Sequence, residues 1–183
     1  MNLLAHLHLG QELDPVAAAG NLTADYCPTA GSDEFLTGIW FHRSIDAFTD
    51  HHPLVTEARS LFPSELRRFA GILCDLAFDL CLSRTWEEWE ECSRDRFIDE
   101  HLTRILEADE LPSGSAEIVQ RGHDERWLHA YAKIEGIGLA IERISLRRPV
   151  FSKMIGAEKH IGRIYPELEQ QFRLFYPQLR AHI

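Results

Sequence analysis

One eleven-residue stretch constrains the fold of this chain more than any other. Residues 72–82 read Ile-Leu-Cys-Asp-Leu-Ala-Phe-Asp-Leu-Cys-Leu, and they are apolar around the whole circumference of a helix except at Asp75 and Asp79. A helix that is apolar on all sides is normally central and buried. The stretch therefore predicts a core helix that carries two carboxylates one turn apart.

Two buried carboxylates at this spacing repel each other, and burial of an unpaired ion costs on the order of several kcal/mol. A bound cation, arginine partners or protonation of one carboxylate would compensate. We favour a cation, because aspartate combined with histidine suits Mg²⁺, Mn²⁺, Fe or Zn²⁺. The alternative is an Arg–Asp network, whose candidate members are Arg43, Arg67, Arg68 and Arg84.

A second segment, residues 38–53, carries a polar stripe. At about 100° per residue, His42, Asp46 and Thr49 share one narrow face of a helix, with Asp50 beside it. The i, i+4 spacing lets the imidazole and the carboxylate of Asp46 converge on one cation. The alternatives are a surface pair and a buried histidine whose hydrogen bonds are satisfied. The polar stripe borders an apolar one made of Phe41, Ile45 and Phe48.

Two further stretches contain candidate ligands. Asp25 ends an apolar helix that includes residues 20–25, and His6 and His8 lie within the first helix. Each alone is equally well explained as a helix-end charge or a packed histidine. Together with the two helices above, they form a His/Asp set drawn from four segments, which is what a metallophosphohydrolase of the HD type requires.

Helical periodicity recurs along the whole chain, and alternating strand-like patterns are rare. We therefore expect an all-α fold, a single compact helical domain over residues 1–183; the His/Asp set described above makes the expected fold HD-phosphohydrolase-like. The clearest break, at residues 111–114, separates no second domain. The expected helices cover 2–9, 14–26, 33–49, 53–61, 63–83, 86–106, 114–121, 124–131, 135–146, 149–155 and 158–182.

Charge narrows the choice of partners. The net charge of −10 argues against general nucleic-acid binding. Residues 143–183 carry eight Lys/Arg and three Asp/Glu, whereas residues 1–142 carry 11 and 26. A basic C-terminal segment on an acidic protein could steer an acidic partner. The alternative is an ordinary solvated surface.

Composition also predicts the compartment. No run approaches the ~18 apolar residues that cross a membrane, so we expect no membrane span. Residues 1–9 lack a basic leader and contain two histidines, which predicts that they belong to the fold and not to an export signal. The four cysteines form no C-x-x-C pair. These features favour a reduced, cytoplasmic protein.

The same segments resemble a known family. The residues 2–9, 20–25 and above all the string from His42 to Pro53 are similar to those of the acyl carrier protein phosphodiesterases, also called acyl carrier protein hydrolases. The resemblance continues in order through residues 74–79, 82–86, 127–131, 147–149 and 175–177. It therefore spans almost the whole chain, and its most specific part is the His42–Pro53 string.

The resemblance implies a divergent branch of the HD phosphohydrolases that acts in fatty acid biosynthesis. Such enzymes use a divalent metal, typically Mn²⁺ with Mg²⁺ or Fe²⁺ as alternatives, to remove 4′-phosphopantetheine from the serine of holo-acyl carrier protein. Arg43 would meet the phosphate, and Asp50 or His51 would manage the leaving-group proton. The acidic carrier protein would contact Arg147, Arg148 and Lys153. The implied metal or catalytic residues are His6, Asp25, His42, Asp46, Asp75 and Asp79.

Two positions depart from the family pattern. The family usually has Asp-His where this chain has Asp79-Leu80, and an apolar residue where it has Thr23. Leucine can neither bind a metal nor transfer a proton. Two alternatives to carrier-protein hydrolysis therefore stay open: hydrolysis of another small phosphoester, and a non-catalytic carrier-protein-binding homologue with a degraded metal site.

Overall fold

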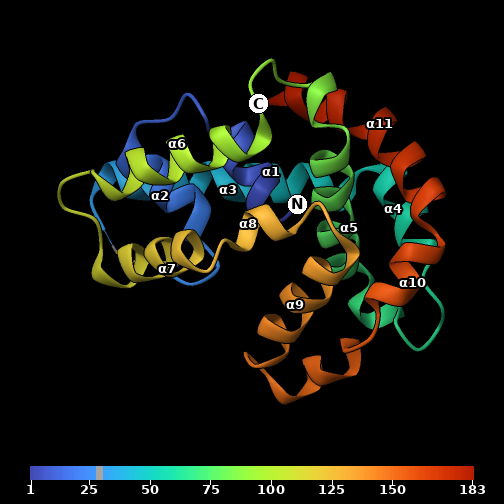
Figure 1. Ribbon diagram of the computed structural model, residues 1–183. Coiled ribbons are helices and arrows are strands. Elements are labelled where there is room, and N and C mark those ends of the chain that lie inside the picture. Colours follow the sequence, from blue (N-terminus) through green and yellow to red (C-terminus); the bar gives the residue numbers. More distant parts are fainter. Residues whose placement is uncertain (28–30) are drawn as a thin grey trace.

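The computed structural model describes residues 1–27 and 31–183 (Figure 1). Within these residues the chain forms eleven α-helices, three short 3₁₀ helices and no strand, which confirms the expected all-α class. The α-helices are α1 (Leu3–Leu9), α2 (Pro15–Thr23), α3 (Asp33–His51), α4 (Pro53–Ser60), α5 (Ala70–Arg84), α6 (Arg94–Leu106), α7 (Ser113–Asp124), α8 (Trp127–Ala130), α9 (Ile134–Ser145), α10 (Glu158–Arg163) and α11 (Tyr165–His182). The 3₁₀ helices are η1 (Arg67–Phe69), η2 (Trp86–Glu88) and η3 (Pro149–Met154).

Helix α5 is the central element, as its apolar circumference predicts. Eleven of its fifteen residues are buried, and it packs against α1, α4, α9 and α11. In Figure 1, α2, α6 and α7 lie on one side of the N-terminus and α4, α5, α10 and α11 on the other. One continuous apolar core runs through both groups. None of the described helices combines the length and the apolar character that a membrane span requires.

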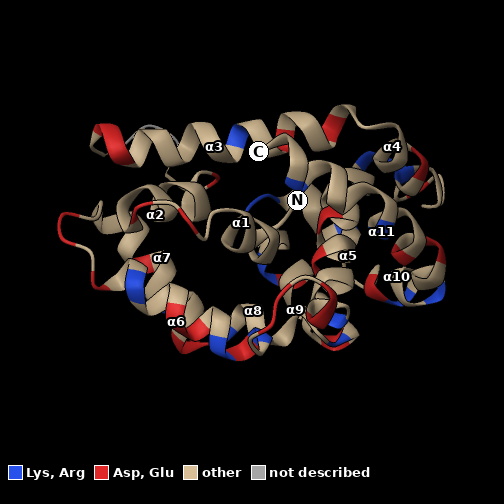
Figure 2. Cartoon of the chain, turned by 90° about the horizontal axis from the view of Figure 1, so that it is seen from above, with Lys and Arg blue, Asp and Glu red and all other residues tan. Residues whose placement is uncertain are grey.

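Helices α2 and α3 pack backbone to backbone. A Cβ atom on Gly38 would lie 1.8 Å from the carbonyl oxygen of Ala17, and one on Gly20 would lie 2.1 Å from that of Phe35. Only glycine allows this approach. Seen from above, α3 runs along one edge of the molecule from the α2 side to the α4 side (Figure 2). The close contact brings the end of α2 beside the middle of α3.

Two of the expected helices begin later than their patterns predict. The helix expected over 63–83 starts only at Ala70, because residues 64–68 are mostly exposed and bury no apolar face. The helix expected over 86–106 is interrupted before Arg94. There the indole nitrogen of Trp86 donates a hydrogen bond to the carbonyl of Cys92 at 2.9 Å, which ties the chain into a loop.

The expected C-terminal helix over 158–182 is two helices. α10 ends at Arg163, and α11 begins at Tyr165 with Pro166 in its first turn. Proline suits that position because its missing N–H is not needed there. The segment expected to be helical over 149–155 is a 3₁₀ helix, η3.

Asp79 of α5 anchors the first helix. Its Oδ2 accepts a hydrogen bond from the Leu4 amide at 2.8 Å, and its Oδ1 accepts one from the Ala5 amide at 3.2 Å. The first amides of a helix lack partners within the helix and carry partial positive charge. Asn2 at the N-cap position makes no side-chain hydrogen bond to them. A carboxylate 75 residues away therefore caps α1.

The variant Asp79→Ala should lower the free energy of unfolding by about 3 kcal/mol, because two buried amides lose their acceptor. Urea unfolding followed by circular dichroism measures the loss. Asp33→Ala is the control, since it removes an exposed first-turn carboxylate of α3 and should cost less than about 1 kcal/mol. Equal losses in the two variants would contradict the capping role.

Candidate metal centre

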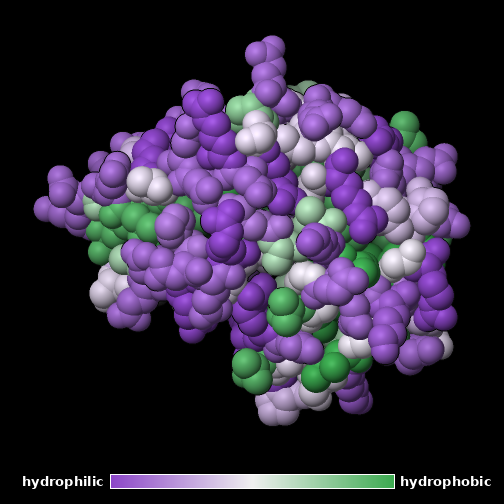
Figure 3. All heavy atoms as spheres, viewed as in Figure 1, coloured by the Kyte–Doolittle hydropathy of each residue, from purple (hydrophilic) through white to green (hydrophobic). Residues whose placement is uncertain are grey.

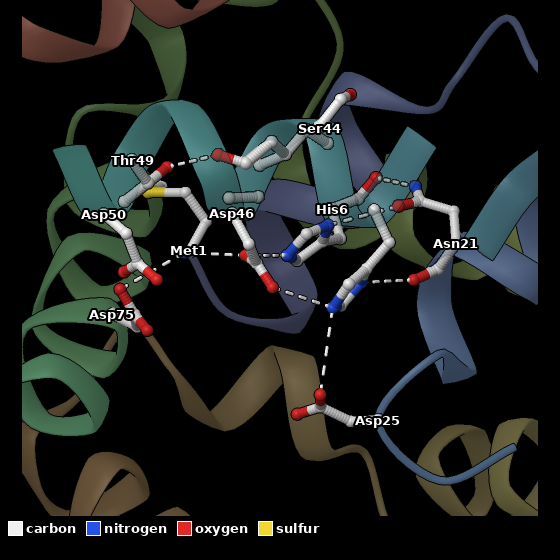
Figure 4. A network of polar contacts seen from close by, with 12 residues as sticks. Met1, His6, Asn21, Asp25, Ser44, Asp46, Thr49, Asp50 and Asp75 are labelled. Atoms are coloured by element: carbon white, nitrogen blue, oxygen red, sulfur yellow. Dashed lines mark hydrogen bonds and ion pairs between the residues drawn. The ribbon is translucent and has the colours of Figure 1, made fainter. Parts of the chain in front are cut away.

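Three ligand-type side chains converge at the middle of the molecule (Figure 4). The Nε2 atoms of His6 and His42 lie 3.3 and 3.0 Å from the two carboxylate oxygens of Asp46. The imidazole rings stack with their centroids 3.9 Å apart. Among the described residues, this is the one group of three or more His, Cys, Asp or Glu whose ligand atoms all lie within 4.8 Å of one another. Helix α1 therefore supplies a ligand-type side chain to the pair on α3.

Asn21 of α2 orients both imidazoles. Its side-chain oxygen lies 3.1 Å from Nδ1 of His6, and its main-chain oxygen lies 2.8 Å from Nδ1 of His42. Its amide nitrogen donates to the main-chain oxygen of His6 at 2.7 Å, which identifies the side-chain oxygen as the acceptor. Both Nδ1 atoms therefore carry the proton, and both Nε2 atoms present a lone pair.

In this arrangement the Nε2 lone pairs of the two imidazoles face the carboxylate oxygens of Asp46, which are hydrogen-bond acceptors as well. Nε2 of His6 is buried without a hydrogen-bond partner, and it faces the carboxylate of Asp46. Burial lowers the pKa of His6 to about 4, so the ring is neutral near pH 7. Burial alone would raise the pKa of Asp46, but its polar neighbours, the Met1 ammonium among them, hold it well below its usual range. Two imidazoles and one carboxylate fit a divalent cation.

Two more carboxylates flank this group. Oδ1 of Asp25 lies 3.9 Å from Nε2 of His42, on an exposed side chain at the end of α2. Oδ1 of Asp75 lies 3.2 Å from the α-amino nitrogen of Met1, which in turn lies 3.4 Å from Oδ1 of Asp46 (Figure 4). Burial raises the pKa of Asp75. The ammonium thus partly compensates the negative charge of Asp75. The group of His6, His42 and Asp46, called the metal-like group below because its side chains are of metal-ligand type, therefore has a carboxylate on either side.

Asp79, in contrast, is separate from the group. Both of its oxygens bind the amides of α1, and burial raises its pKa to about 7 against the lowering effect of those amides. Asp79 was expected to be a metal ligand, but in the structure both of its carboxylate oxygens already accept hydrogen bonds from the α1 amides. The neighbouring Leu80 is fully buried in the apolar core. Its difference from the family pattern removes no ligand from the group of His6, His42 and Asp46.

The remaining candidates on and near α3 point elsewhere. Asp50 is exposed and paired with Arg59 of α4. The negative charge of Asp75 also contributes to raising the pKa of Arg59. Arg43 is exposed, with its guanidinium 5.2 Å from the ring centroid of Trp40. His51 is exposed and bonds the carbonyl of Ala47 at 2.8 Å. The arginine beside Asp75 is thus Arg59, which is not one of the four that the pattern proposed for an Arg–Asp network.

A cleft of about 680 Å³ adjoins the group. Asp25 and Asp75 line it, so it reaches the two carboxylates that flank the group of His6, His42 and Asp46. Arg147 donates to the main-chain oxygen of Asp25 at 3.0 Å, and its second nitrogen lies 3.8 Å from that carboxylate. Lys153 is exposed on η3 and does not line the cleft. The basic lining residues are Arg121, Arg143, Arg147 and Arg148.

Thr23, the second departure from the family pattern, has a structural partner. Its hydroxyl donates to the carbonyl of Ala19 and contacts the hydroxyl of Ser115 on α7, both at 2.8 Å. Both hydroxyls are buried. The polar residue at this position therefore joins α2 to α7, one wall of the cleft.

Comparison with known proteins identifies the family of this chain. The family model described as acyl carrier protein phosphodiesterase matches residues 1–179. This chain belongs to that family. The acyl carrier protein phosphodiesterase of Yersinia enterocolitica is 37% identical and covers 99% of this chain and 96% of its own length. Those of Serratia proteamaculans and Escherichia coli O139:H28 are 35% and 33% identical, over 98% and 99% of this chain and 95% and 96% of their own lengths. A comparison with solved structures gives no match.

The family and the site together show what the sequence patterns missed. Asn21 lies in a segment that matches the family, and the patterns assign it no role, although a lone amide in the apolar run of residues 17–22 is a recognisable signal. Arg121 and Arg143 gave no signal, because they lie on separate helices that only the fold brings to one cleft. The HD-type likeness of the fold stays a prediction.

In the metal-free protein, the His6 ring should titrate near pH 4 because burial disfavours its charged form. The unfolded chain, with a value near 6.5, binds this proton first. His6 should therefore make the free energy of unfolding fall as the pH drops from about 6.5 to 4, and His6→Gln should weaken that dependence. NMR titration of the ring measures the midpoint, and a value at or above 6.5 would refute the assignment.

Proposed function

We propose that this chain hydrolyses the phosphodiester that joins 4′-phosphopantetheine to the serine of holo-acyl carrier protein, which yields the apo form. The observation that carries the proposal is the group of His6, His42 and Asp46, whose ligand atoms all lie within 4.8 Å of one another, near a cleft lined by arginines. Membership of the acyl carrier protein phosphodiesterase family supports the substrate.

The proposed cofactor is a divalent cation, Mn²⁺ first, with Mg²⁺ or Fe²⁺ as alternatives. His6, His42 and Asp46 would hold it, and Asp25 and Asp75 are the next nearest carboxylates. A mixed set of imidazole and carboxylate ligands suits Mn²⁺ and Fe²⁺, whereas Mg²⁺ prefers oxygen ligands alone. When bound, the cation lowers the pKa of the attacking water and withdraws charge from the phosphoryl oxygens.

The surrounding residues have distinct proposed roles. Asp25 takes the proton from water as its oxygen bonds to phosphorus, and Arg147 stabilises charge on the phosphoryl oxygens. The bond from phosphorus to the serine oxygen breaks, and that oxygen takes up a proton to give the serine hydroxyl and free 4′-phosphopantetheine. Arg147 replaces Arg43 in this scheme because its guanidinium lies beside Asp25. Asp79 acts by holding α1, and Asp50 is left to its pair with Arg59.

The proposal extends to the compartment and the partner. All four cysteines are unpaired, which favours a reducing cytoplasm. The substrate protein is acidic, and this fits the exposed basic residues Arg148 and Lys153 as its proposed contacts, with Arg147 kept for the phosphate. An acidic enzyme of this charge is not proposed to bind nucleic acid.

Purified protein saturated with Mn²⁺ should convert holo-acyl carrier protein to the apo form, with free 4′-phosphopantetheine detected by mass spectrometry. Asp46→Ala should lower the rate about 10³-fold, since it removes a ligand whose cation contributes several kcal/mol of charge stabilisation. The folded variant Asp33→Ala is the control. Hydrolysis of small phosphodiesters alone would favour the rival substrate class, and carrier binding without metal or turnover would favour a non-catalytic protein.

Asn21→Ala should weaken Mn²⁺ binding about 10- to 100-fold, because His6 loses the acceptor that fixes its tautomer and ring orientation. Isothermal titration calorimetry gives the affinity, and thermal unfolding confirms that the variant is folded. Thr37→Ala, which removes an exposed hydroxyl from α3, should bind Mn²⁺ as the unaltered protein does. Unchanged affinity in the Asn21 variant would remove Asn21 from the site.

A further inference from the structure

Two arginines from separate helices share one aromatic ring in the wall of the cleft. The guanidinium carbons of Arg121 on α7 and Arg143 on α9 lie 5.0 and 4.7 Å from the ring centroid of Trp127. Trp127 is buried, and its indole nitrogen donates to the carboxylate of Glu125 at 2.6 Å. The ring is therefore fixed, and cation–π attraction holds both guanidinium groups against it.

These two guanidinium groups are available to a ligand. Among the described residues, the guanidinium groups of Arg121 and Arg143 make no ion pair and no hydrogen bond with the rest of the chain; their contacts are those with Trp127. One terminal nitrogen of Arg143 is also buried without a partner. Such donors gain most from a negatively charged acceptor, because forked guanidinium donors match a carboxylate or phosphate.

The charge of the cleft is opposite to that of the molecule. Four arginines line it against two carboxylates, Asp25 and Asp75, whereas the chain as a whole carries a net charge of −10. Asp25 is already paired with Arg147. The concentration of positive charge at this one place favours an acidic ligand there.

The arginines extend away from the metal-like group in a sequence of short steps. Asp25 neighbours His42, Arg147 neighbours Asp25, and Arg143 lies in the last turn of α9, which ends two residues before Arg147. Arg121 and Arg143 both contact the ring of Trp127. The surface is indented between the parts of the molecule that carry α7 and α9 (Figure 3), the two helices to which these arginines belong.

We propose that Arg121 and Arg143 bind a carboxylate on the surface of the acidic carrier protein, at a place separate from the phosphodiester that is cleaved. This inference rests on the proposed function. Arg147 serves the reacting phosphate, and the pair on Trp127 serves the protein that carries it. The pair thereby makes the enzyme prefer a carrier-bound phosphodiester over a free one of the same chemistry.

Steady-state kinetics on two substrates tests the division. With Mn²⁺-loaded protein, Arg143→Ala should raise the KM for holo-acyl carrier protein about tenfold with kcat within about twofold, because a docking charge is lost. Its kcat/KM for bis(p-nitrophenyl) phosphate should stay within about twofold. Arg121→Ala should act in the same direction. Arg143→Lys, which keeps the charge but not the fork, should fall between Arg143→Ala and the unaltered protein.

Arg163→Ala is the matched control, since it removes an exposed arginine of the same basic C-terminal segment outside the cleft and should leave both substrates unaffected. An unchanged KM for the carrier protein, or an equal loss on both substrates, would overturn the docking role. Calorimetric binding of apo-acyl carrier protein is measured in parallel and needs no turnover. If the unaltered protein hydrolyses neither substrate but its arginine variants lose this binding, the proposed function fails and the docking surface stands.

Discussion

The hydrogen bonds from the α1 amides to the Asp79 carboxylate join the first helix of the chain to its central one. Helix α5 is buried on all sides, so the carboxylate it carries sits where water cannot compensate it. The first amides of α1, which have no partners within their own helix, compensate the carboxylate instead. Because α1 carries His6, this contact helps to place the third member of the group so that it faces Asp46, together with the hydrogen bonds that Asn21 makes to His6. The cluster depends on a capping interaction that takes no part in chemistry.

Much of this architecture is predictable from residue patterns. The apolar circumference of residues 72–82 predicts the central helix, and the i, i+4 spacing of His42 and Asp46 predicts a pair that the structure does bring together. The role of Asp79 was not predictable. A cation and a helix N-terminus both compensate a buried carboxylate, and spacing along one helix cannot distinguish them. Asp75 raises the same difficulty, because its nearest positive charge is the Met1 ammonium.

Contacts between distant segments account for the other differences. Asn21 is one residue in an apolar helix until the close approach of α2 and α3 places it beside two imidazoles. Arg59 and the arginines on Trp127 likewise acquire their neighbours only in the fold. The predicted helix boundaries are wrong where a side chain bonds a backbone group outside its own turn, as the indole of Trp86 does with the carbonyl of Cys92. Leu80 packs in the apolar core, a role that the apolar circumference of its helix predicts.

The close packing of α2 against α3, which Gly20 and Gly38 allow, gives the site two unequal halves. Asn21, His42 and Asp46 belong to a pair of helices whose backbones touch, and this pair cannot separate without losing extensive packing. His6 belongs to a seven-residue helix that is too short to persist alone. Local opening of α1 would expose its amides to hydrogen exchange and withdraw one imidazole at the same moment. Cation release and amide exchange in α1 would then be one event, governed by one opening free energy.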